Sequence, residues 1–294
     1  MRISGKRNAS SEDKNKIVGG VLYLVATPIG NLSDITERAL KVLENVDFVA
    51  AEDTRNTGKL LAYFGISKPM VSYFEHNKRG RGEVILEKLK NGESCALVTD
   101  AGTPAISDPG EDLVRLCAEN DVVVTSIPGC CACVNALALS GLATGRFCFE
   151  GFLSTNKNER LERLNSIKSD TRTTIFYEAP HKLVKTLEDI LDIFGDRKIA
   201  LCRELTKINE EIIRTTLSGA ISYYEQNAPR GEYVLVIEGC DENALKNDAF
   251  WSKMSVNEHV EYYISQGMKK MDAIKAVARD RDVPKNEIYK EVNC

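Results

Sequence analysis

One acidic, glycine-containing turn carries the groups best suited to binding a ligand. It runs from Asp100 to Gly110 as Asp-Ala-Gly-Thr-Pro-Ala-Ile-Ser-Asp-Pro-Gly and follows an apolar stretch at residues 95–99. A carboxylate, hydroxyl groups and a flexible backbone thus stand where a buried strand ends and a helical pattern begins. Because open α/β sheets bind ligands beyond the carboxyl ends of their strands, we expect Asp100 to lie in a binding site. The structural alternative is a side-chain hydrogen bond that closes the turn. Asp108 is expected to cap the next helix.

Strands that alternate with helical patterns surround this turn and must position it. Apolar, β-prone stretches predict five strands in the first half of the chain, at residues 21–27, 48–51, 70–73, 95–99 and 122–127. Helical patterns lie between them, including one at 83–89, and another follows at about 131–139. This alternation is typical of a mostly parallel sheet with helices on both faces.

A second alternating series predicts another α/β domain. Its strand candidates lie at residues 147–150, 173–177, 199–203, 212–217 and 233–238, with helices near 160–167 and 181–193. No helical pattern separates 199–203 from 212–217, so we expect a mixed sheet. The fold class is therefore α/β, with two αβα domains. The expected units are a disordered tail (1–19), an N-terminal α/β domain (20–143), a C-terminal α/β domain (144–240) and a helical extension (241–294).

Composition and absent motifs exclude several functions. The net charge of −4 over 294 residues argues against a generally basic nucleic-acid-binding protein. No apolar run approaches the roughly 20 residues of a membrane span, and the first 16 residues lack the apolar segment of a secretory signal, so we expect a cytoplasmic protein. The phosphate loop and the nucleophile elbow of hydrolases are missing. Cys130 and Cys133 have the spacing of zinc ligands, but no second pair completes such a site, so we expect no metal.

Several short motifs occur in a fixed order along the chain. They include Thr-Pro-Ile-Gly-Asn-Leu at 27–32, Glu-Asp-Thr-Arg at 52–55, Asp-Ala-Gly-Thr-Pro at 100–104, Tyr-Glu-Ala-Pro-His at 177–181 and Arg-Glu-Leu-Thr-Lys at 203–207. Over about residues 20–240 the chain resembles the ribosomal RNA small subunit methyltransferase I family of the tetrapyrrole methylase superfamily. Two positions depart from that pattern, since Cys130 and Ser154 stand where the family commonly has proline.

The resemblance implies a reaction and a cofactor. Members of the family are two-domain α/β proteins, usually homodimers. They use S-adenosylmethionine to methylate the ribose 2′-hydroxyl of a cytidine in the decoding region of 16S ribosomal RNA. By analogy, the residues expected to contact or shape the cofactor site are Ile29, Asp100, Gly102, Thr103, Pro104, Ile106, Cys131, Ala132 and Tyr177. The cofactor supplies the difficult chemistry, and the protein mainly positions the reacting atoms.

A ribose hydroxyl is a weak acid, so a nearby base or a positive charge would assist its methylation. The catalytic candidates are Asp53, Glu204, Arg203 and Lys207, and Glu52 and Glu178 compete for the role of base. A structural ion pair is the alternative role for each of these side chains.

Contact with RNA requires local positive charge, because neutralisation of phosphates dominates affinity. A basic, glycine-containing loop at residues 76–82 offers Lys78, Arg79 and Arg81, and a later helix offers Lys157 and Arg160. The expected partner is 16S ribosomal RNA or the small ribosomal subunit. A merely solvated surface is the alternative for both patches.

Three functions remain open on the sequence. The favoured one is an RNA 2′-O-methyltransferase that uses S-adenosylmethionine. A small-molecule methyltransferase of the same fold would have a closed apolar cavity and no response to RNA. A non-catalytic ribosome-binding protein would bind the cofactor and RNA without methyl transfer.

Overall fold

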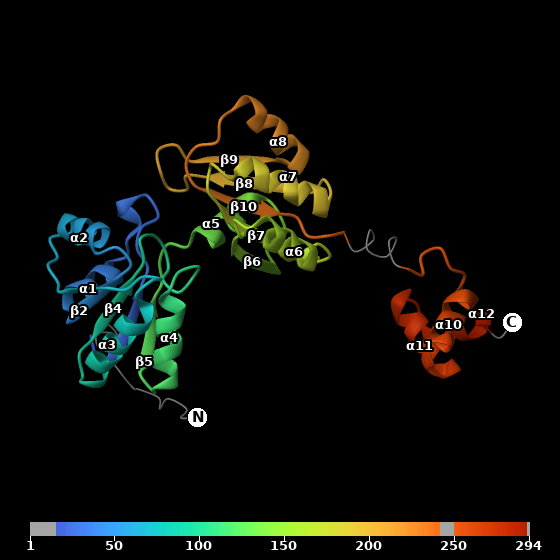
Figure 1. Ribbon diagram of the computed structural model, residues 1–294, viewed down its shortest axis with the longest axis horizontal. Coiled ribbons are helices and arrows are strands. Elements are labelled where there is room, and N and C mark those ends of the chain that lie inside the picture. The colour runs from blue at the N-terminus through green and yellow to red at the C-terminus, as the bar shows by residue number, and fades with distance from the viewer. Residues whose placement is uncertain (1–15, 242–249, 293–294) are drawn as a thin grey trace.

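The computed structural model describes residues 16–241 and 250–292. Along the chain, an N-terminal α/β domain is followed by a second α/β domain and a group of three helices (Figure 1). Most of the tail predicted at 1–19, and residues 242–249 and 293–294 of the predicted extension, lie outside the described residues. Within the described part of the chain, no helix has the length and apolar character needed to cross a membrane.

The first sheet consists of five parallel strands in the order β3-β2-β4-β1-β5. They are β1 (Val21–Val25), β2 (Phe48–Ala51), β3 (Met70–Ser72), β4 (Cys95–Val98) and β5 (Val123–Ile127). All residues of β2 and β4 are buried, as expected for central strands covered on both faces. The predicted parallel sheet is confirmed, and the adjacent strands β1 and β4 bring their following loops together.

Helices cover both faces of this sheet. They are α1 (Glu37–Asn45), α2 (Thr54–Tyr63), α3 (Lys78–Lys90) and α4 (Gly110–Glu119), and a short 3-10 helix, η2 (Leu32–Asp34), precedes them. Leu43 of α1 and Leu61 of α2 pack in one core. Leu89 of α3 and Leu113 of α4 pack in the other. The domain therefore has three layers and two apolar cores.

The second sheet is mixed, as predicted. Its strands are β6 (Phe147–Phe152), β7 (Thr173–Glu178), β8 (Lys198–Arg203), β9 (Glu211–Thr216) and β10 (Tyr233–Ile237), in the order β6-β7-β10-β8-β9. β6 and β7 are parallel, whereas β10 runs antiparallel to both of its neighbours and β8 runs antiparallel to β9. Helices α6 (Lys157–Ile167), α7 (Leu183–Phe194) and α8 (Leu217–Gln226) share one core with this sheet.

Helix α5 (Ala132–Ser140) contributes to the other core of the second sheet. Its Cys133, Ala136 and Leu137 pack with Ile175 of β7 and Val236 of β10. The loop after β5 of the first domain thus leads directly into the core of the second. The predicted domain boundary after residue 143 lies just beyond this helix and stays a prediction.

The C-terminal unit contains α10 (Val256–Ser265), α11 (Lys270–Asp280) and α12 (Lys285–Val292). Ser255 caps α10 through a reciprocal pair of hydrogen bonds with Glu258. Val260, Ile274 and Ile288, one from each helix, form an apolar core of their own.

The sequence prediction of a basic loop at residues 76–82 is wrong, because α3 already begins at Lys78. Asn77 ends the preceding turn by accepting a hydrogen bond of 2.9 Å from the N–H of Phe74. Gly82 faces inward, where a Cβ atom would lie 3.3 Å from Leu116 of α4. Gly82 therefore permits close helix packing rather than marking a loop.

Candidate active site

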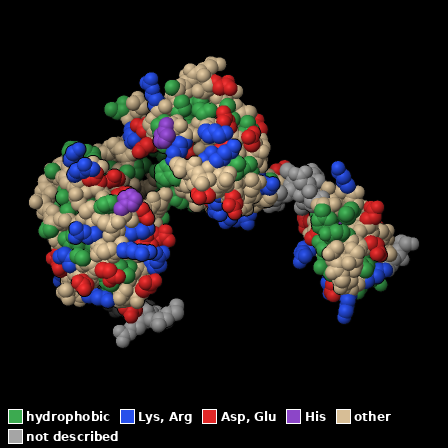
Figure 2. Space-filling view, viewed as in Figure 1, with side chains coloured by type: hydrophobic (Ala, Val, Ile, Leu, Met, Phe, Trp, Pro, Cys, Tyr) green, Lys and Arg blue, Asp and Glu red, His purple; other side chains and the backbone are tan. Residues whose placement is uncertain are grey.

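A cavity of about 490 Å³ lies between the two α/β domains. On the first domain its walls are formed by residues that follow β1, β2, β4 and β5, at the carboxyl ends of parallel strands. This is where open α/β sheets bind ligands. Figure 2 shows the surface hollowed between the two domains. The volume is typical of a small-molecule site.

The loop after β4 is fastened to the loop after β1. Thr27 and Gly102 exchange two backbone hydrogen bonds, of 2.9 and 3.1 Å. Gly102 has a φ of +87°, a conformation that favours glycine. A Cβ atom at this position would lie 3.3 Å from Cγ2 of Ile29, which also lines the cavity. Gly102 therefore keeps the backbone of the loop close to the ligand space.

The carboxylate of Asp108 supports the second half of this loop. It accepts hydrogen bonds from the N–H groups of Ala105 (3.0 Å), Ile106 (3.2 Å) and Gly110 (2.8 Å). Ala105 and Ser107 both have positive φ angles, +67° and +66°, which residues with a Cβ atom rarely adopt. Burial raises the pKa of Asp108. The expected hydrogen bond to the start of α4 is present, and the same carboxylate stabilises the strained turn.

Two further carboxylates give the first-domain wall a negative charge. Glu52 accepts a hydrogen bond of 2.7 Å from the Thr99 hydroxyl group. Asp100 accepts one of 3.5 Å from the Asn56 amide. Burial, and then the charge of Glu52, raises the pKa of Asp100. A cationic ligand would relieve this repulsion.

The loop between β5 and α5 closes a third side of the cavity. The Thr103 hydroxyl group donates a hydrogen bond of 2.8 Å to the carbonyl oxygen of Cys130. At Gly129, a Cβ atom would lie only 2.8 Å from Cβ of Ala26, so the loop packs tightly against the end of β1. Because Cys130 accepts this bond through its backbone carbonyl, the contact does not depend on the cysteine side chain.

Tyr177 of β7 forms the facing wall on the second domain. Its hydroxyl oxygen accepts a hydrogen bond of 3.2 Å from the N–H of Cys133. The rings of Phe149 and Phe152 meet it edge to face, with centroids 4.9 and 5.5 Å away. Burial raises the pKa of Tyr177, so the phenol stays neutral near pH 7. The wall is therefore aromatic and uncharged at this point.

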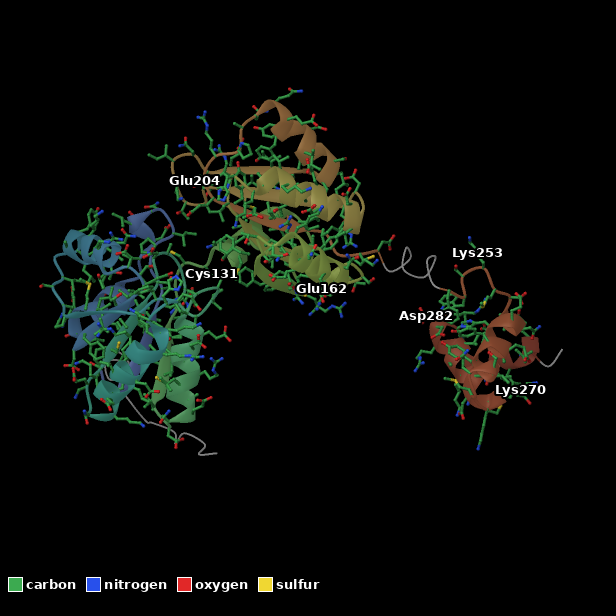
Figure 3. The ribbon with its side chains drawn as sticks, in the orientation of Figure 1. Cys131, Glu162, Glu204, Lys253, Lys270 and Asp282 are labelled. Carbon is green, nitrogen blue, oxygen red and sulfur yellow. The ribbon has the colours of Figure 1, made fainter. Side chains whose placement is uncertain are left out.

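A network of three charged side chains borders the cavity beside Tyr177. Lys207 Nζ donates hydrogen bonds to Glu204 Oε1 (2.8 Å) and Glu232 Oε2 (3.0 Å), and Glu204 Oε1 also accepts one of 2.9 Å from the N–H of Glu232. Lys207 holds the pKa of Glu204 below its usual range. Burial lowers the pKa of Lys207, but the hydrogen bonds with the two carboxylates raise it more, so the pKa of Lys207 lies above its usual value. Figure 3 labels Glu204 on the second domain and Cys131 at the junction of the two domains.

Most of the predicted cofactor residues meet at this cavity. The members that line it are Ile29, Asp100, Gly102, Thr103, Ile106, Cys131, Ala132 and Tyr177. Pro104 is buried and is not among the lining residues. The contact of these residues with a cofactor stays a prediction.

The four catalytic candidates separate into two pairs. Glu204 and Lys207 line the cavity, whereas Asp53 and Arg203 do not. Asp53 caps α2 through the N–H of Arg55 and forms an ion pair of 2.7 Å with its guanidinium group. Arg203 forms an ion pair of 3.0 Å with Glu211 on the neighbouring strand. Asp53 and Arg203 thus form ion pairs outside the lining of the cavity, and a catalytic role for either one stays an untested prediction.

The two competing bases also line the cavity, but with different surroundings. Glu178 is buried and accepts hydrogen bonds from the Thr186 hydroxyl (2.5 Å) and the N–H of Ala179 (2.8 Å), which fix the end of β7. Glu52 is held by Thr99. Both carboxylates therefore have structural partners.

Sequence reasoning missed several lining residues, among them Phe152, Leu205 and Glu232. Leu205 lies inside the Arg-Glu-Leu-Thr-Lys motif at 203–207, so a motif that carries the resemblance pointed to it. No motif or spacing in the sequence near Phe152 predicted that it lines a cavity. Its ring is half-exposed because it faces the cavity from the end of β6.

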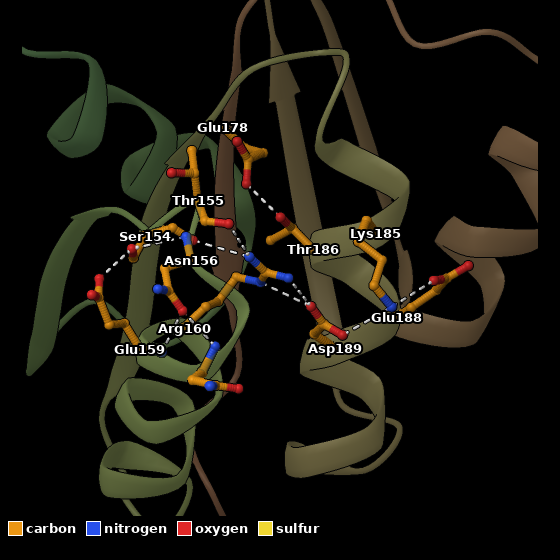
Figure 4. A network of polar contacts seen from close by, with 11 residues as sticks. Ser154, Thr155, Asn156, Glu159, Arg160, Glu178, Lys185, Thr186, Glu188 and Asp189 are labelled. Atoms are coloured by element: carbon orange, nitrogen blue, oxygen red, sulfur yellow. Dashed lines mark hydrogen bonds and ion pairs between the residues drawn. The ribbon is translucent and has the colours of Figure 1, made fainter.

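Arg160, which was predicted to contact RNA, is buried in the second domain. Its guanidinium group forms an ion pair of 2.7 Å with Asp189, and it donates hydrogen bonds to the carbonyl oxygens of Ser154 (3.0 Å) and Thr155 (3.3 Å) (Figure 4). The side chain is only 10% exposed. The prediction is wrong because this charge is already neutralised in joining α6 to α7.

The other predicted RNA contacts lie at the surface. Lys78 forms ion pairs of 2.7 Å with both Glu75 and Asp112. Arg79 and Arg81 are exposed in the first turn of α3, and Lys157 is exposed at the start of α6. In the described ranges, no group of three or more His, Cys, Asp or Glu side chains is arranged to hold a metal ion.

Comparisons with known proteins agree with this architecture. A family model described as Tetrapyrrole (Corrin/Porphyrin) Methylases matches residues 21–221. Among solved structures, the fold is similar to a uroporphyrin-III C-methyltransferase from Thermus thermophilus (TM-score 0.54, 18% identity, 74% of this chain and 94% of that one). It is also similar to diphthine synthase (TM-score 0.56, 15% identity, 74% and 90%). The predicted tetrapyrrole-methylase-like fold is confirmed.

Curated relatives match nearly the whole chain. Proteins named Ribosomal RNA small subunit methyltransferase I are 48% identical in Halalkalibacterium halodurans and in Bacillus subtilis, in each case over 92% of this chain and 93% of the relative. The relative of that name in Escherichia coli O157:H7 is 43% identical over 92% of this chain and 94% of its own length. The chain therefore belongs to the ribosomal RNA small subunit methyltransferase I family, within the tetrapyrrole methylases.

Proposed function

We propose that this protein methylates the ribose 2′-hydroxyl of a cytidine in the decoding region of 16S ribosomal RNA, with S-adenosylmethionine as the methyl donor. One observation supports this most strongly. The motifs at 27–32, 100–104 and 203–207, which are far apart in the sequence, all contribute residues to a single cavity between the domains. Relatives that share these motifs over most of the chain carry a name that states methylation of small-subunit ribosomal RNA.

The cavity fits S-adenosylmethionine in size and charge. Its volume of about 490 Å³ suits a ligand of that size. Gly102 leaves open the space beside Ile29 that a Cβ atom would fill. When bound, S-adenosylmethionine supplies an electrophilic methyl group on a positively charged sulfur. Asp100 and Glu52 give the nearby wall the opposite charge, which attracts a cation.

Glu204 and Lys207 are the pair we propose for catalysis. Glu204 is ionised near pH 7 and borders the cavity, so its carboxylate can accept the proton of the ribose hydroxyl. The Lys207 ammonium group can stabilise the negative charge that develops on the ribose oxygen. Glu232 and the close packing against Gly30 hold Lys207 in position, and positioning is the main requirement of methyl transfer.

For the RNA, we propose that Arg79 and Arg81 on α3 and Lys157 on α6 contact phosphates. All three are exposed, and Lys78 adds a partly neutralised charge beside them. Such contacts weaken steeply as salt concentration rises.

We also propose a homodimer that works in the cytoplasm on the small ribosomal subunit. β5 and β6 are edge strands, and each exposes an apolar side chain, Val123 and Phe147 respectively. Exposed edges of this kind favour association. Sedimentation of the purified protein tests the dimer.

The proposed reaction is tested by two measurements on one preparation of folded protein. Calorimetry should show binding of S-adenosylmethionine, and label from its methyl group should enter 16S RNA of purified small subunits. Binding of the cofactor and of subunits without transfer would favour the non-catalytic ribosome-binding protein. Transfer to a tetrapyrrole but not to RNA would favour the small-molecule methyltransferase.

A further inference from the structure

Ile208 is an apolar side chain with no protein neighbours to cover it. Its side chain is fully exposed, although isoleucine is among the residues most often buried. It lies in the loop 204–210 that joins β8 to β9, between Lys207 and Asn209. The fold does not need Ile208 for its core.

The loop that carries Ile208 is held rigidly. Backbone hydrogen bonds of 3.0 Å join the Lys207 N–H to the Glu204 carbonyl and the Glu210 N–H to the Lys207 carbonyl. The Glu210 carboxylate accepts a hydrogen bond of 2.6 Å from the N–H of Thr206. Glu204 and Thr206 adopt positive φ angles, +50° and +67°, that these contacts stabilise. Ile208 is therefore presented on a fixed turn rather than on a loose one.

This turn adjoins the cavity and the first domain. Glu204, Leu205 and Lys207 all line the cavity, so Ile208 directly follows a lining residue. The stem of Lys207 packs against the first domain, where a Cβ atom on Gly30 would lie 2.4 Å from Lys207 Cγ. Figure 1 shows the β8–β9 loop at the edge of the second domain that faces the first. Ile208 thus lies next to the wall that Glu204, Leu205 and Lys207 form, but outside the lining of the cavity itself.

We propose that Ile208 is a positioning residue that inserts into the base stack of the RNA substrate beside the target nucleotide. This inference rests on the proposed function. A ribose that reacts inside a cavity must leave its helix or loop, and its departure opens a gap between neighbouring bases. Proteins fill such gaps with apolar wedges such as isoleucine. A rigid, fully exposed isoleucine beside the cavity has the chemistry and the place for that role.

The first test is a series of substitutions at Ile208, assayed with purified small subunits. Ile208→Ala and Ile208→Ser should lower kcat/KM about tenfold, because neither side chain is large and apolar enough to fill the gap that the displaced nucleotide leaves between its neighbouring bases. Ile208→Phe, which keeps a large apolar side chain, should retain activity. Asn209→Ala, an exposed neighbour on the same turn, is the matched control and should behave as the wild type. Affinity for S-adenosylmethionine should be equal in all variants, since Ile208 does not line the cavity.

The second test reports the insertion itself. An RNA hairpin with 2-aminopurine next to the target cytidine should gain fluorescence on binding the wild type and Ile208→Phe, but not Ile208→Ala at saturation. The inference is overturned if Ile208→Ala methylates subunits as fast as the wild type, or if it raises the fluorescence equally. It is also overturned if Ile208→Ala changes the oligomeric state, because Ile208 would then be a subunit contact. If the wild type transfers no methyl group to RNA, the proposed function fails and this inference fails with it.

Discussion

The hydroxyl oxygen of Tyr177 accepts a hydrogen bond of 3.2 Å from the backbone N–H of Cys133. This bond joins β7 to the first turn of α5, whose preceding loop belongs to the first domain. Tyr177 and the two residues before Cys133 line the cavity. The bond therefore sets the distance between two walls of the site.

Tyr177→Phe should weaken the binding of S-adenosylmethionine about fivefold, which corresponds to the loss of a hydrogen bond worth about 1 kcal/mol. The ring contacts with Phe149 and Phe152 remain, so the domain should stay folded. Calorimetry measures the affinity, and Tyr63→Phe, at an exposed tyrosine, is the control. Equal affinity in Tyr177→Phe and the wild type would show that this bond does not shape the site.

Gly30→Ala should lower activity and the free energy of unfolding together. The new Cβ atom would lie 2.4 Å from Lys207 Cγ, so Lys207 must move away from Glu204 or the domains must separate. Overpacking of this kind costs about 1–3 kcal/mol. Chemical denaturation and methyl-transfer rates measure the two effects. Gly145→Ala, where a Cβ atom meets nothing within 4 Å, should leave both unchanged. A fully active Gly30→Ala enzyme would argue against a fixed Lys207.

The pH dependence of the reaction should be flat around neutrality. The pKa of Glu204 lies below its usual 4.5, so its ionised form persists until the pH falls through that lowered value. The pKa of Lys207 lies above its usual 10.5, so its charge persists until the pH rises beyond it. The value of kcat/KM should therefore be constant from about pH 6 to 9. A step near pH 7 that depends on either residue would contradict the proposed roles.

Removal of either charge should reduce turnover without unfolding the protein. Glu204→Gln and Lys207→Met keep the size of the side chains and should each lower kcat about 100-fold, a modest value for acid–base catalysis. Asp53→Asn is the comparison, because Asp53 pairs with Arg55 outside the cavity and should leave kcat near that of the wild type. A large loss of kcat in Asp53→Asn would restore Asp53 as a catalytic candidate.

Residues that line the cavity could be predicted from the sequence, but the ion-pair partners of the charged side chains could not. The loop 100–110 was predicted because a strand, a carboxylate and a glycine with a special backbone role occur consecutively, and that signal is local. Asp53 and Arg203 stand in equally specific motifs, but the structure places them in ion pairs with Arg55 and Glu211. Such pairing depends on side-chain direction, and spacing along the chain does not determine it.

Arg160 shows the same limit on a helix. Lys157, Arg160 and Arg163 recur at three-residue spacing, which indicates a shared side of α6 but not whether that side meets water or another helix. The partner, Asp189, lies on α7, 29 residues further along the chain. Similarly, Gly80 and Gly82 indicate a loop by propensity, whereas packing of α3 against α4 favours the helix.

Arg160→Ala should therefore lower the stability of the protein, whereas Lys157→Ala should weaken its binding to RNA. Arg160→Ala leaves the buried carboxylate of Asp189 with the exposed Lys185 as its one remaining ion-pair partner among the described residues, and should cost about 3–5 kcal/mol of the free energy of unfolding. Lys157→Ala should leave stability unchanged and should weaken RNA binding with a smaller dependence on salt. Denaturation curves and RNA-binding titrations at two salt concentrations separate the two roles. If Arg160→Ala were stable but defective in RNA binding, Arg160 would have to reach the RNA after all.

The most direct test of the central claim is a map of ribose methylation on small-subunit RNA from cells that lack this gene. The proposed function predicts the loss of one 2′-O-methyl group, on a cytidine of the decoding region. The wild-type gene should restore it, and Glu204→Gln should not. An unchanged map in cells without the gene would contradict the claim that this protein methylates 16S ribosomal RNA.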